Sequence, residues 1–352
     1  MVLTNSTRTR FGVAAARATT NPGPPPDHHR GRRWAVLVLG VVVLAALSGC
    51  ASPAAPSVAP SSTAVSAPSG EQPVATSVAD WAGVRDVLGR PGTLSGTVFR
   101  VPLPRSDLAV TSEGVAIKPG LSLGGYAAFT RYPEITMLMG DLVVTEAELP
   151  TLTDALRAAG IAQTALHKHL LEQNPPLWWT HVHAMGDPMQ LARGLAAALK
   201  LTATPPATPL ATGPGATQPP VELDTAGIDA ALGRTGTADG GIYKISIARG
   251  ETIVDEGHVL PAGLGVTTGI NFQPLGGGNA ATNGDIAMTA DEVQNVISAL
   301  RHGGIQVVSV HNHGLTEQPR LFYLHFWAVN DAVSLARALR PALDATHLKP
   351  AS

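Results

Sequence analysis

The stretch that decides the fold occurs twice in this chain. Residues 145–200 read TEAELPTLTDALRAAGIAQTALHKHLLEQNPPLWWTHVHAMGDPMQLARGLAAALK, and residues 289–344 read TADEVQNVISALRHGGIQVVSVHNHGLTEQPRLFYLHFWAVNDAVSLARALRPALD. The two stretches align without a gap at an offset of 144 positions, from 145 to 289. Three histidines coincide in this frame: His167, His169 and His181 fall on His311, His313 and His325. Because two copies act as an internal alignment, these histidines direct the search for chemistry.

The duplication extends upstream of the histidines and covers a whole domain. Upstream matches are Val98-Phe99-Arg100-Val101 with Ile242-Tyr243-Lys244-Ile245, and Gly140-Asp141 with Gly284-Asp285. Solenoid repeats have periods of about 20 to 50 residues, so this longer period indicates two domains rather than a solenoid. We predict repeat 1 over residues 80–200, repeat 2 over residues 221–345 and a short tail over residues 346–352.

Each repeat is predicted to mix helices with an antiparallel sheet. The expected order in repeat 1 is a helix over 80–88, strands near 97–103, 108–112, 125–130 and 135–144, a helix to Ala159, strands near 161–169 and 177–184, and a helix to Lys200. Thr145 and Glu148 have the capping-box spacing, and Gly160 is a helix stop. Asp187 and Asp331 are expected to be helix N-caps. The predicted class is α+β: two homologous tandem domains, each with two main helices in a ferredoxin-like βαββα half beside a β-rich front half.

The N-terminal part of the chain has the pattern of an export signal. A basic segment with Arg32 and Arg33 precedes an apolar run from Trp34 to Leu47, which is too short to span a bilayer comfortably. The run ends in Leu47-Ser48-Gly49-Cys50, which resembles a bacterial lipobox. We therefore predict a signal peptide over residues 1–49 and a lipid (palmitate) anchor on Cys50. The mature chain would be held on the extracytoplasmic face of the cell membrane.

Composition sets further limits on organisation and partners. Residues 50–79 and 201–220 are rich in Ala, Pro, Thr and other small residues, so we predict a disordered tether and an interdomain linker there. Cys50 is the only cysteine, so disulfides cannot stabilise the exported part. A net charge of -2 without a basic patch gives nucleic-acid binding no electrostatic support.

The histidines of repeat 1 are predicted to share one face of a β-hairpin. Residues two apart in a strand point the same way, so His167 and His169 share a face, as do His181 and His183. If the hairpin is centred on Pro175, His169 lies opposite His181 and His167 lies opposite His183. Cross-strand neighbours of this kind have Cβ atoms about 4.5–5.5 Å apart.

Repeat 2 repeats this arrangement with one change. With Pro319 in the turn, His313 would lie opposite His325, and His311 would lie opposite Trp327, which replaces the fourth histidine. Three imidazoles that converge with an open position are typical of zinc sites, and copper accepts the same ligands. The histidines of both repeats are therefore predicted to bind zinc or copper.

The opposite face of the hairpin is apolar, with Phe322, Leu324 and Phe326, so the histidines are expected to point away from the core toward solvent or a cleft. Three aromatic residues share the histidine side and are predicted to line a ligand cleft: Trp179, Tyr323 and Trp327. A simpler alternative is that these are sheet-surface histidines whose hydrogen bonds are made to one another, to backbone or to water.

Acidic residues near the histidines have two interpretations. Gly140-Asp141 and Gly284-Asp285 are explained either as strand ends or as partners of a metal or a hydrogen bond. Glu317 is the nearest candidate for a catalytic base in repeat 2, and a solvated loop charge is the alternative.

The histidine region resembles a known family of lipoproteins. His311-Asn312-His313, the turn at Pro319, His325-Phe326-Trp327 and Asp331 before the run Leu335-Ala336-Arg337 resemble the LppY/LpqO-type bacterial lipoprotein family, which is built on a domain of unknown function. Repeat 1 departs from the pattern at Lys168 and His183. The resemblance implies an envelope lipoprotein, in accord with Cys50, and implies no activity.

Three functions remain open from the sequence. The first is an envelope-anchored lipoprotein whose duplicated histidine sites bind a transition metal. The second is a metal-dependent hydrolase of the cell envelope, in which the metal activates water. The third is a metal-free module that binds glycan or a protein partner through its aromatic residues. The sequence also leaves open whether the two sites work separately or face each other.

Overall fold

The computed structural model describes residues 69–207 and 219–351. Both repeats belong to a single compact unit. The predicted signal peptide, the lipidation site at Cys50 and the middle of the predicted linker lie outside the described residues. Within the described residues, no helix combines the length and the apolar character needed to cross a membrane.

Repeat 1 contains one six-stranded sheet and a set of helices. Its elements are η1 (Val78–Trp81), α1 (Ala82–Leu88), β1 (Thr93–Ser95), β2 (Val98–Pro104), β3 (Val110–Ser112), β4 (Val115–Ile117), α2 (Pro119–Ser122), β5 (Gly124–Arg131), β6 (Thr136–Thr145), α3 (Leu149–Ala158), β7 (Ala162–His167), β8 (Leu177–Gly186) and α4 (Pro188–Leu199). The strand order is β1-β2-β5-β6-β8-β7, and all neighbours are antiparallel. Strands β6 and β7 flank β8 and are joined through α3, which is the split βαβ arrangement predicted from the sequence.

Repeat 2 has the same topology. Its elements are α5 (Thr225–Leu232), β9 (Thr237–Asp239), β10 (Ile242–Ala248), β11 (Val254–Asp255), β12 (His258–Val259), η2 (Ala262–Leu264), β13 (Thr267–Gly276), β14 (Asn279–Met288), α6 (Val293–His302), β15 (Gln306–His311), β16 (Phe322–Asp331) and α7 (Ala332–Asp344). The strand order β15-β16-β14-β13-β10-β9 is that of repeat 1 read from the other end. The predicted α+β class with two similar domains is confirmed.

Local sequence signals explain where the helices begin and end. The Thr145 amide donates to Glu148 Oε2 at 2.8 Å, and the Glu148 amide donates to Thr145 Oγ1 at 3.3 Å, which is the predicted capping box. Helix α3 begins only at Leu149, because this pair closes a separate turn first. Gly160 adopts a φ of 71°, which explains glycine after the helix. Asp187 accepts the amides of α4 as the predicted N-cap.

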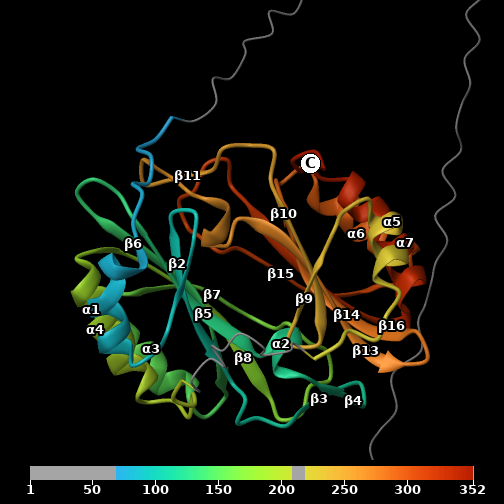
Figure 1. Cartoon of the computed structure of the whole chain (residues 1–352), viewed down its shortest axis with the longest axis horizontal. Helices are drawn as coiled ribbons and strands as arrows, with labels where there is room; N and C mark the ends of the chain where they lie inside the picture. Colours follow the sequence, from blue (N-terminus) through green and yellow to red (C-terminus); the bar gives the residue numbers. More distant parts are fainter. Residues whose placement is uncertain (1–68, 208–218, 352) are drawn as a thin grey trace, which may run out of the picture. The chain divides into compact units, whose positions relative to one another are not determined.

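Two kinds of apolar core hold the unit together. One core per repeat lies between its helices and one face of its sheet. Figure 1 shows α1, α3 and α4 along the sheet of repeat 1, and α5, α6 and α7 along that of repeat 2. Two further cores combine side chains from both repeats, such as Met137 with Tyr323 and Val143 with Trp327. The other faces of the two sheets therefore cover each other.

This packing corrects the expectation that the histidine face is open to solvent or a cleft. The histidines lie on the sheet faces that meet between the repeats, and His167, His181 and His325 are each no more than 4% exposed. Hydrogen bonds from side-chain hydroxyls to backbone carbonyls tie the repeats together in this region: Thr164 Oγ1 donates to the carbonyl of His313 at 2.5 Å, and Ser309 Oγ donates to that of Lys168 at 2.8 Å. One copy of an amphipathic sheet thus covers the other.

The predicted hairpin register is wrong. His167 lies opposite Trp179 rather than His183, and His181 lies opposite Ala165 rather than His169. In repeat 2, correspondingly, His311 pairs with Tyr323 and His325 with Ser309.

The cause of the different register is tertiary pairing of the hairpin loop. Asn174 forms a bridge with Thr111, and Gln318 forms one with Val254, so these residues cannot extend the hairpin. The shift is an even number of residues, so the histidines keep the predicted face of the sheet.

The predicted tether also differs at its end. Glu71 forms a β-bridge with His258, and the Val74 amide donates to the carbonyl of Arg131 at 2.9 Å. The segment from residue 71 is therefore paired with the folded unit instead of being free up to residue 79.

Candidate metal centre

Six histidines, three from each repeat, form one cluster between the two sheets. His167 and His311 stack on each other with ring centroids 3.9 Å apart and an interplanar angle of 8°. On either side of this pair, the ring centroids of His169 and His325 lie 3.8 Å apart, and those of His181 and His313 also lie 3.8 Å apart. Equivalent residues make equivalent contacts, so the cluster has an approximate two-fold symmetry, and the two predicted sites form one.

Two aspartates lie beside the histidines because of the strand register. Asp141 on β6 is directly opposite His181 on β8, and Asp285 on β14 is directly opposite His325 on β16. The glycine before each aspartate is required by close strand contact: a Cβ atom would lie 2.6 Å from a backbone oxygen at Gly140 and 2.2 Å at Gly284. The duplicated Gly-Asp pairs thus lie within strands, and the aspartates are partners of the histidines.

Backbone carbonyls fix the orientation of three imidazoles. The Nδ1 atoms of His181, His313 and His325 lie 3.2, 2.6 and 2.7 Å from the carbonyl oxygens of Gly140, Gly265 and Gly284. A carbonyl oxygen only accepts hydrogen bonds, so Nδ1 carries the proton in each ring, and Nε2 of His181 and of His325 carries a free lone pair. This is the arrangement in which histidines bind metals through Nε2. His313 Nε2 instead faces the carboxylate of Asp285.

Many polar atoms of the cluster are buried without a hydrogen-bond partner. They are Nε2 of His181 and His325, both ring nitrogens of His311, Nδ1 of His167, and Oδ1 of Asp141 and of Asp285. A buried polar atom without a partner costs about 1–3 kcal/mol, so such a concentration calls for an explanation. A cation would satisfy several of these lone pairs at once.

Within residues 69–207 and 219–351, three sets of donors have the spacing of a metal site. Within each set the ligand atoms lie within 4.8 Å of one another, and the sets are His167, His169 and His325; His167, His181 and His311; and Asp285, His311 and His325. The first two sets draw on both repeats. A metal held there would therefore link the two repeats directly.

The aspartates bring negative charge to the cluster. Asp285 Oδ2 lies 3.0 Å from His313 Nε2, and the equivalent Asp141 Oδ2 lies 3.4 Å from His169 Nε2. His169 Nε2 also lies 2.9 Å from His167 Nε2, so one of these two nitrogens carries the proton.

Burial keeps most of the imidazoles neutral. It lowers the pKa of four histidines well below the usual range, with a further contribution from neighbouring histidines, and lowers that of His325 as well; the four are His167, His169, His181 and His311. Burial and the charge of Asp285 raise the pKa of Asp141. For Asp285, burial acts against ionisation, but His325 and His313 outweigh it and lower the pKa. Neutral imidazoles are the form that binds metals.

The metal-free chain is expected to lose stability between pH 7 and pH 5. Five histidines have folded pKa values below the unfolded value of about 6.5, so the unfolded chain binds more protons as the pH falls through 6.5. Each of these histidines lowers the free energy of unfolding by up to roughly 1 kcal/mol for each pH unit of acidification. Asp141 has a raised pKa and acts in the opposite sense, but it is only one group. Urea unfolding in EDTA at several pH values measures this, and equal stability at pH 7 and pH 5 contradicts it.

His183 lies apart from the cluster. Its Nε2 is 3.5 Å from Asp255 Oδ2, and Asp255 also accepts a hydrogen bond from Thr316 Oγ1 at 2.6 Å. Among the described residues, no donor set with metal-site spacing includes His183. The structure therefore brings together six of the seven predicted histidines.

The three predicted cleft aromatics are all buried, so the prediction of an open aromatic cleft is wrong. Trp179 stacks on His169 at 4.5 Å, and Tyr323 stacks on His313 at 3.3 Å, so both enclose the cluster. Trp327 has no exposed surface and donates through Nε1 to Glu113 Oε2 at 3.0 Å. The cause is the same as for the histidines, because each sheet covers the other.

Glu317 has a structural environment rather than that of a catalytic base. Its carboxylate accepts hydrogen bonds from the Leu321 amide at 3.1 Å and from Arg320 at 3.3 Å. It is only 3% exposed, so it closes the loop before β16 instead of being a solvated charge.

A cavity of about 290 Å³ adjoins the cluster. Its lining includes His169, His181, His313, His325 and both aspartates, together with the basic residues Arg100 and Lys244. Arg100 and Lys244 were not predicted as site residues, although their equivalence in the duplication is visible in the sequence.

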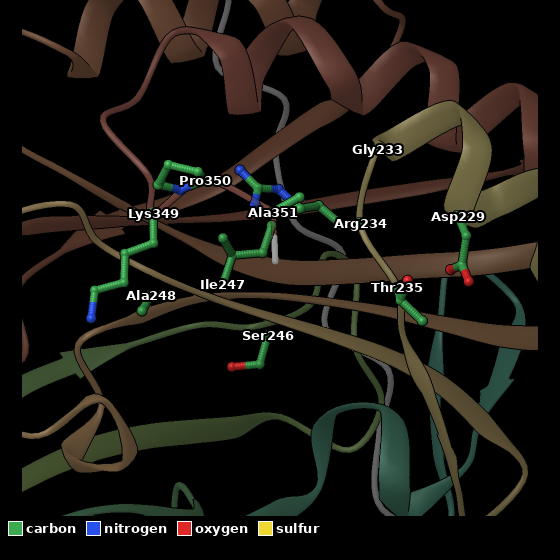
Figure 2. A pocket seen from close by; sticks show the side chains of 10 residues that line it. All are labelled: Asp229, Gly233, Arg234, Thr235, Ser246, Ile247, Ala248, Lys349, Pro350 and Ala351. Carbon is green, nitrogen blue, oxygen red and sulfur yellow. The ribbon is translucent and has the colours of Figure 1, made fainter.

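A second cavity, of about 320 Å³, lies on repeat 2 and contains no histidine (Figure 2). Lys349 and Asp229 lie at opposite ends of the view. The Asp229 carboxylate already accepts a hydrogen bond from the Tyr243 hydroxyl at 2.6 Å. This cavity offers no grouping of reactive side chains.

Three solved structures are distantly similar to this chain. EtuB from Clostridium kluyveri is 11% identical over 73% of this chain and 89% of that chain, with a TM-score of 0.17. The double-ringed trimeric shell protein MSM0271 from the RMM microcompartment is 14% identical over 62% and 86%, with a TM-score of 0.16. The trimeric bacterial microcompartment shell protein PduB is 11% identical over 71% and 86%, with a TM-score of 0.17. With TM-scores this low, none bears on the function of this chain.

Sequence comparison gives a clearer result. No curated protein matches the chain. A family model described as Domain of Unknown Function (DUF1259) matches residues 82–201 and again residues 226–345, which are the two repeats. The matches cover more than half of the chain, so this protein belongs to the family of the Domain of Unknown Function (DUF1259).

Proposed function

We propose that this protein is an envelope-anchored lipoprotein that binds a transition metal, zinc or copper, at one centre shared by its two repeats. The observation that carries the metal half is the set of imidazoles whose Nδ1 atoms face backbone carbonyls. Of these, His181 and His325 each have a buried Nε2 atom without a hydrogen-bond partner, and each belongs to a donor set whose ligand atoms lie within 4.8 Å of one another. A purely structural role leaves these lone pairs unexplained.

The chemistry of the donors favours zinc or copper over magnesium or calcium. Imidazole nitrogen is a preferred ligand of zinc and copper, whereas magnesium and calcium prefer oxygen ligands. The sets around His167 and around His311 supply three donors each, and a carboxylate from Asp285 is available in one of them. Three protein ligands leave a position open, as catalytic zinc sites do.

The envelope half of the proposal is supported by the sequence. Leu47-Ser48-Gly49-Cys50 follows an apolar run, and the histidine region resembles the LppY/LpqO-type lipoproteins. Membership of the DUF1259 family accords with this resemblance at the coarser level of a duplicated domain.

A metal-dependent hydrolase is the second candidate, and the cavity beside the cluster favours it. A substrate could approach the open position of the metal from this cavity. Glu317 is not available as the base, because Arg320 and the Leu321 amide hold its carboxylate. We favour metal binding, since no described carboxylate combines exposure to the cavity with freedom from the histidines.

Elemental analysis of the full chain, purified without a His-tag from the membrane fraction, tests the proposal. We expect near-stoichiometric zinc or copper that EDTA removes, and a Cys50→Ser variant that leaves the membrane fraction but keeps its metal. His183→Ala is the matched control within the predicted histidines, because His183 pairs with Asp255 and should leave metal content unchanged. No metal in the parent chain after reconstitution contradicts the metal half.

A further inference from the structure

The cavity beside the cluster connects solvent with the candidate metal ligands. Its buried floor includes His181, His325 and Asp141, each no more than 6% exposed. Its rim includes Arg100 and Gly124, which are exposed, and Lys244, whose side chain is 31% exposed. A volume of about 290 Å³ accommodates a small molecule and excludes a folded partner.

The two basic residues of the rim occupy equivalent places in the two repeats. Arg100 lies in β2 and Lys244 in β10, at matching positions of the duplicated strands. The Arg100 guanidinium lies 3.3 Å from the centroid of the Tyr126 ring, and among the described residues it forms no ion pair. Lys244 pairs with Asp239 at 2.7 Å, but that carboxylate is 62% exposed and water can replace it.

The polar lining between rim and floor consists of neutral side chains that bond to one another. Asn283 Nδ2 donates to Ser122 Oγ, and Asn271 Nδ2 donates to Asn283 Oδ1 at 3.3 Å. Lys244, Asn271 and Asn283 follow one cross-strand row from β10 through β13 to β14. The row leads from the rim toward Asp285.

The charges of this cavity determine the class of ligand. Arg100 and Lys244 lie at the rim of the cavity, and a divalent metal held by the histidines would add positive charge at its floor. We propose that the cavity binds a small oxyanion, a carboxylate or phosphate group, with one end at Arg100 and Lys244 and the other at the metal. This inference rests on the proposed metal function and names its ligand class.

Calorimetric titration of the zinc-loaded full chain with orthophosphate, and separately with succinate, tests the inference. We expect saturable binding of one of the two anions, and which one binds identifies the oxyanion. Arg100→Gln with Lys244→Gln should weaken anion binding by about tenfold or more, because the charge-assisted hydrogen bonds from both basic side chains to the anion are lost. Zinc content should stay unchanged, because neither residue belongs to a donor set.

The matched control removes the same charges elsewhere. Arg157→Gln with Lys200→Gln changes two exposed residues on the helical side of repeat 1 and should leave anion binding as in the parent. Failure of both anions to bind the zinc-loaded chain, or equal binding by the Arg100→Gln/Lys244→Gln variant, overturns the inference and leaves the metal proposal intact. A chain that takes up no zinc overturns both.

Discussion

Replacing His167 and His311 together by alanine is expected to reduce the metal content of the chain from near-stoichiometric to background. Every donor set with metal-site spacing contains at least one of these two residues. They stack at the centre of the cluster, one from each repeat, so their removal leaves neither repeat with a complete set. Elemental analysis after extensive dialysis measures the loss, and the metal-dependent rise in thermal stability should disappear with it.

The control for this double variant is His302→Ala with His347→Ala. Both residues are exposed and lie outside the donor sets, so the number of histidines falls equally while the cluster stays intact. Because two alanines leave a cavity, His167→Asn with His311→Asn repeats the test with less lost volume. Retention of metal by folded samples of both cluster variants would falsify the shared centre.

Replacing Trp327 by alanine is expected to lower the free energy of unfolding by about 3–5 kcal/mol. The side chain has no exposed surface, packs in a core that combines both repeats, and donates a hydrogen bond to Glu113 across them. Urea unfolding of the parent and the variant measures the difference. Metal content should stay unchanged, because Trp327 belongs to no donor set.

Trp178→Ala provides the matched control of the same residue type. Trp178 is only partly buried and its Nε1 bonds to the exposed Glu146 at 3.2 Å, so a much smaller loss is expected. If Trp327→Ala unfolds at the same urea concentration as the parent, Trp327 does not belong to a packed core. The aromatic cleft predicted from the sequence would then be restored as a ligand surface.

Periodicity and the duplication were sufficient to predict the main helices, the long strands and the histidine face, but not the short elements β1, β4 and α2. The strands β2, β5 and β6 and the helices α3 and α4 fall close to their predicted ranges, because capping residues such as Asp187 act locally. The histidine face was also predicted, because it depends only on the alternation of side chains along a strand. The equivalence of His167 and His311 identified the right residues before any contact was known.

What covers the histidine face is a long-range property, and the sequence pattern did not predict it. The residue pattern of the histidine face is compatible with exposure to solvent and with packing against a second sheet, so local sequence does not distinguish these two environments. The register was mispredicted for a similar reason, because pairing of Asn174 with Thr111 involves residues far apart in the chain. Asp141 and Asp285 were left ambiguous until the strand pairing placed them opposite His181 and His325.

The two-fold relation within the cluster has a consequence for a single repeat. A chain with a single repeat would expose the sheet face that carries the histidines and apolar side chains buried here. The same face of a second identical chain would cover it. The present protein therefore holds within one chain the kind of interface that two copies of a single repeat would form as a homodimer. The two halves differ outside the cluster, where His183 of repeat 1 has Trp327 as its equivalent in repeat 2.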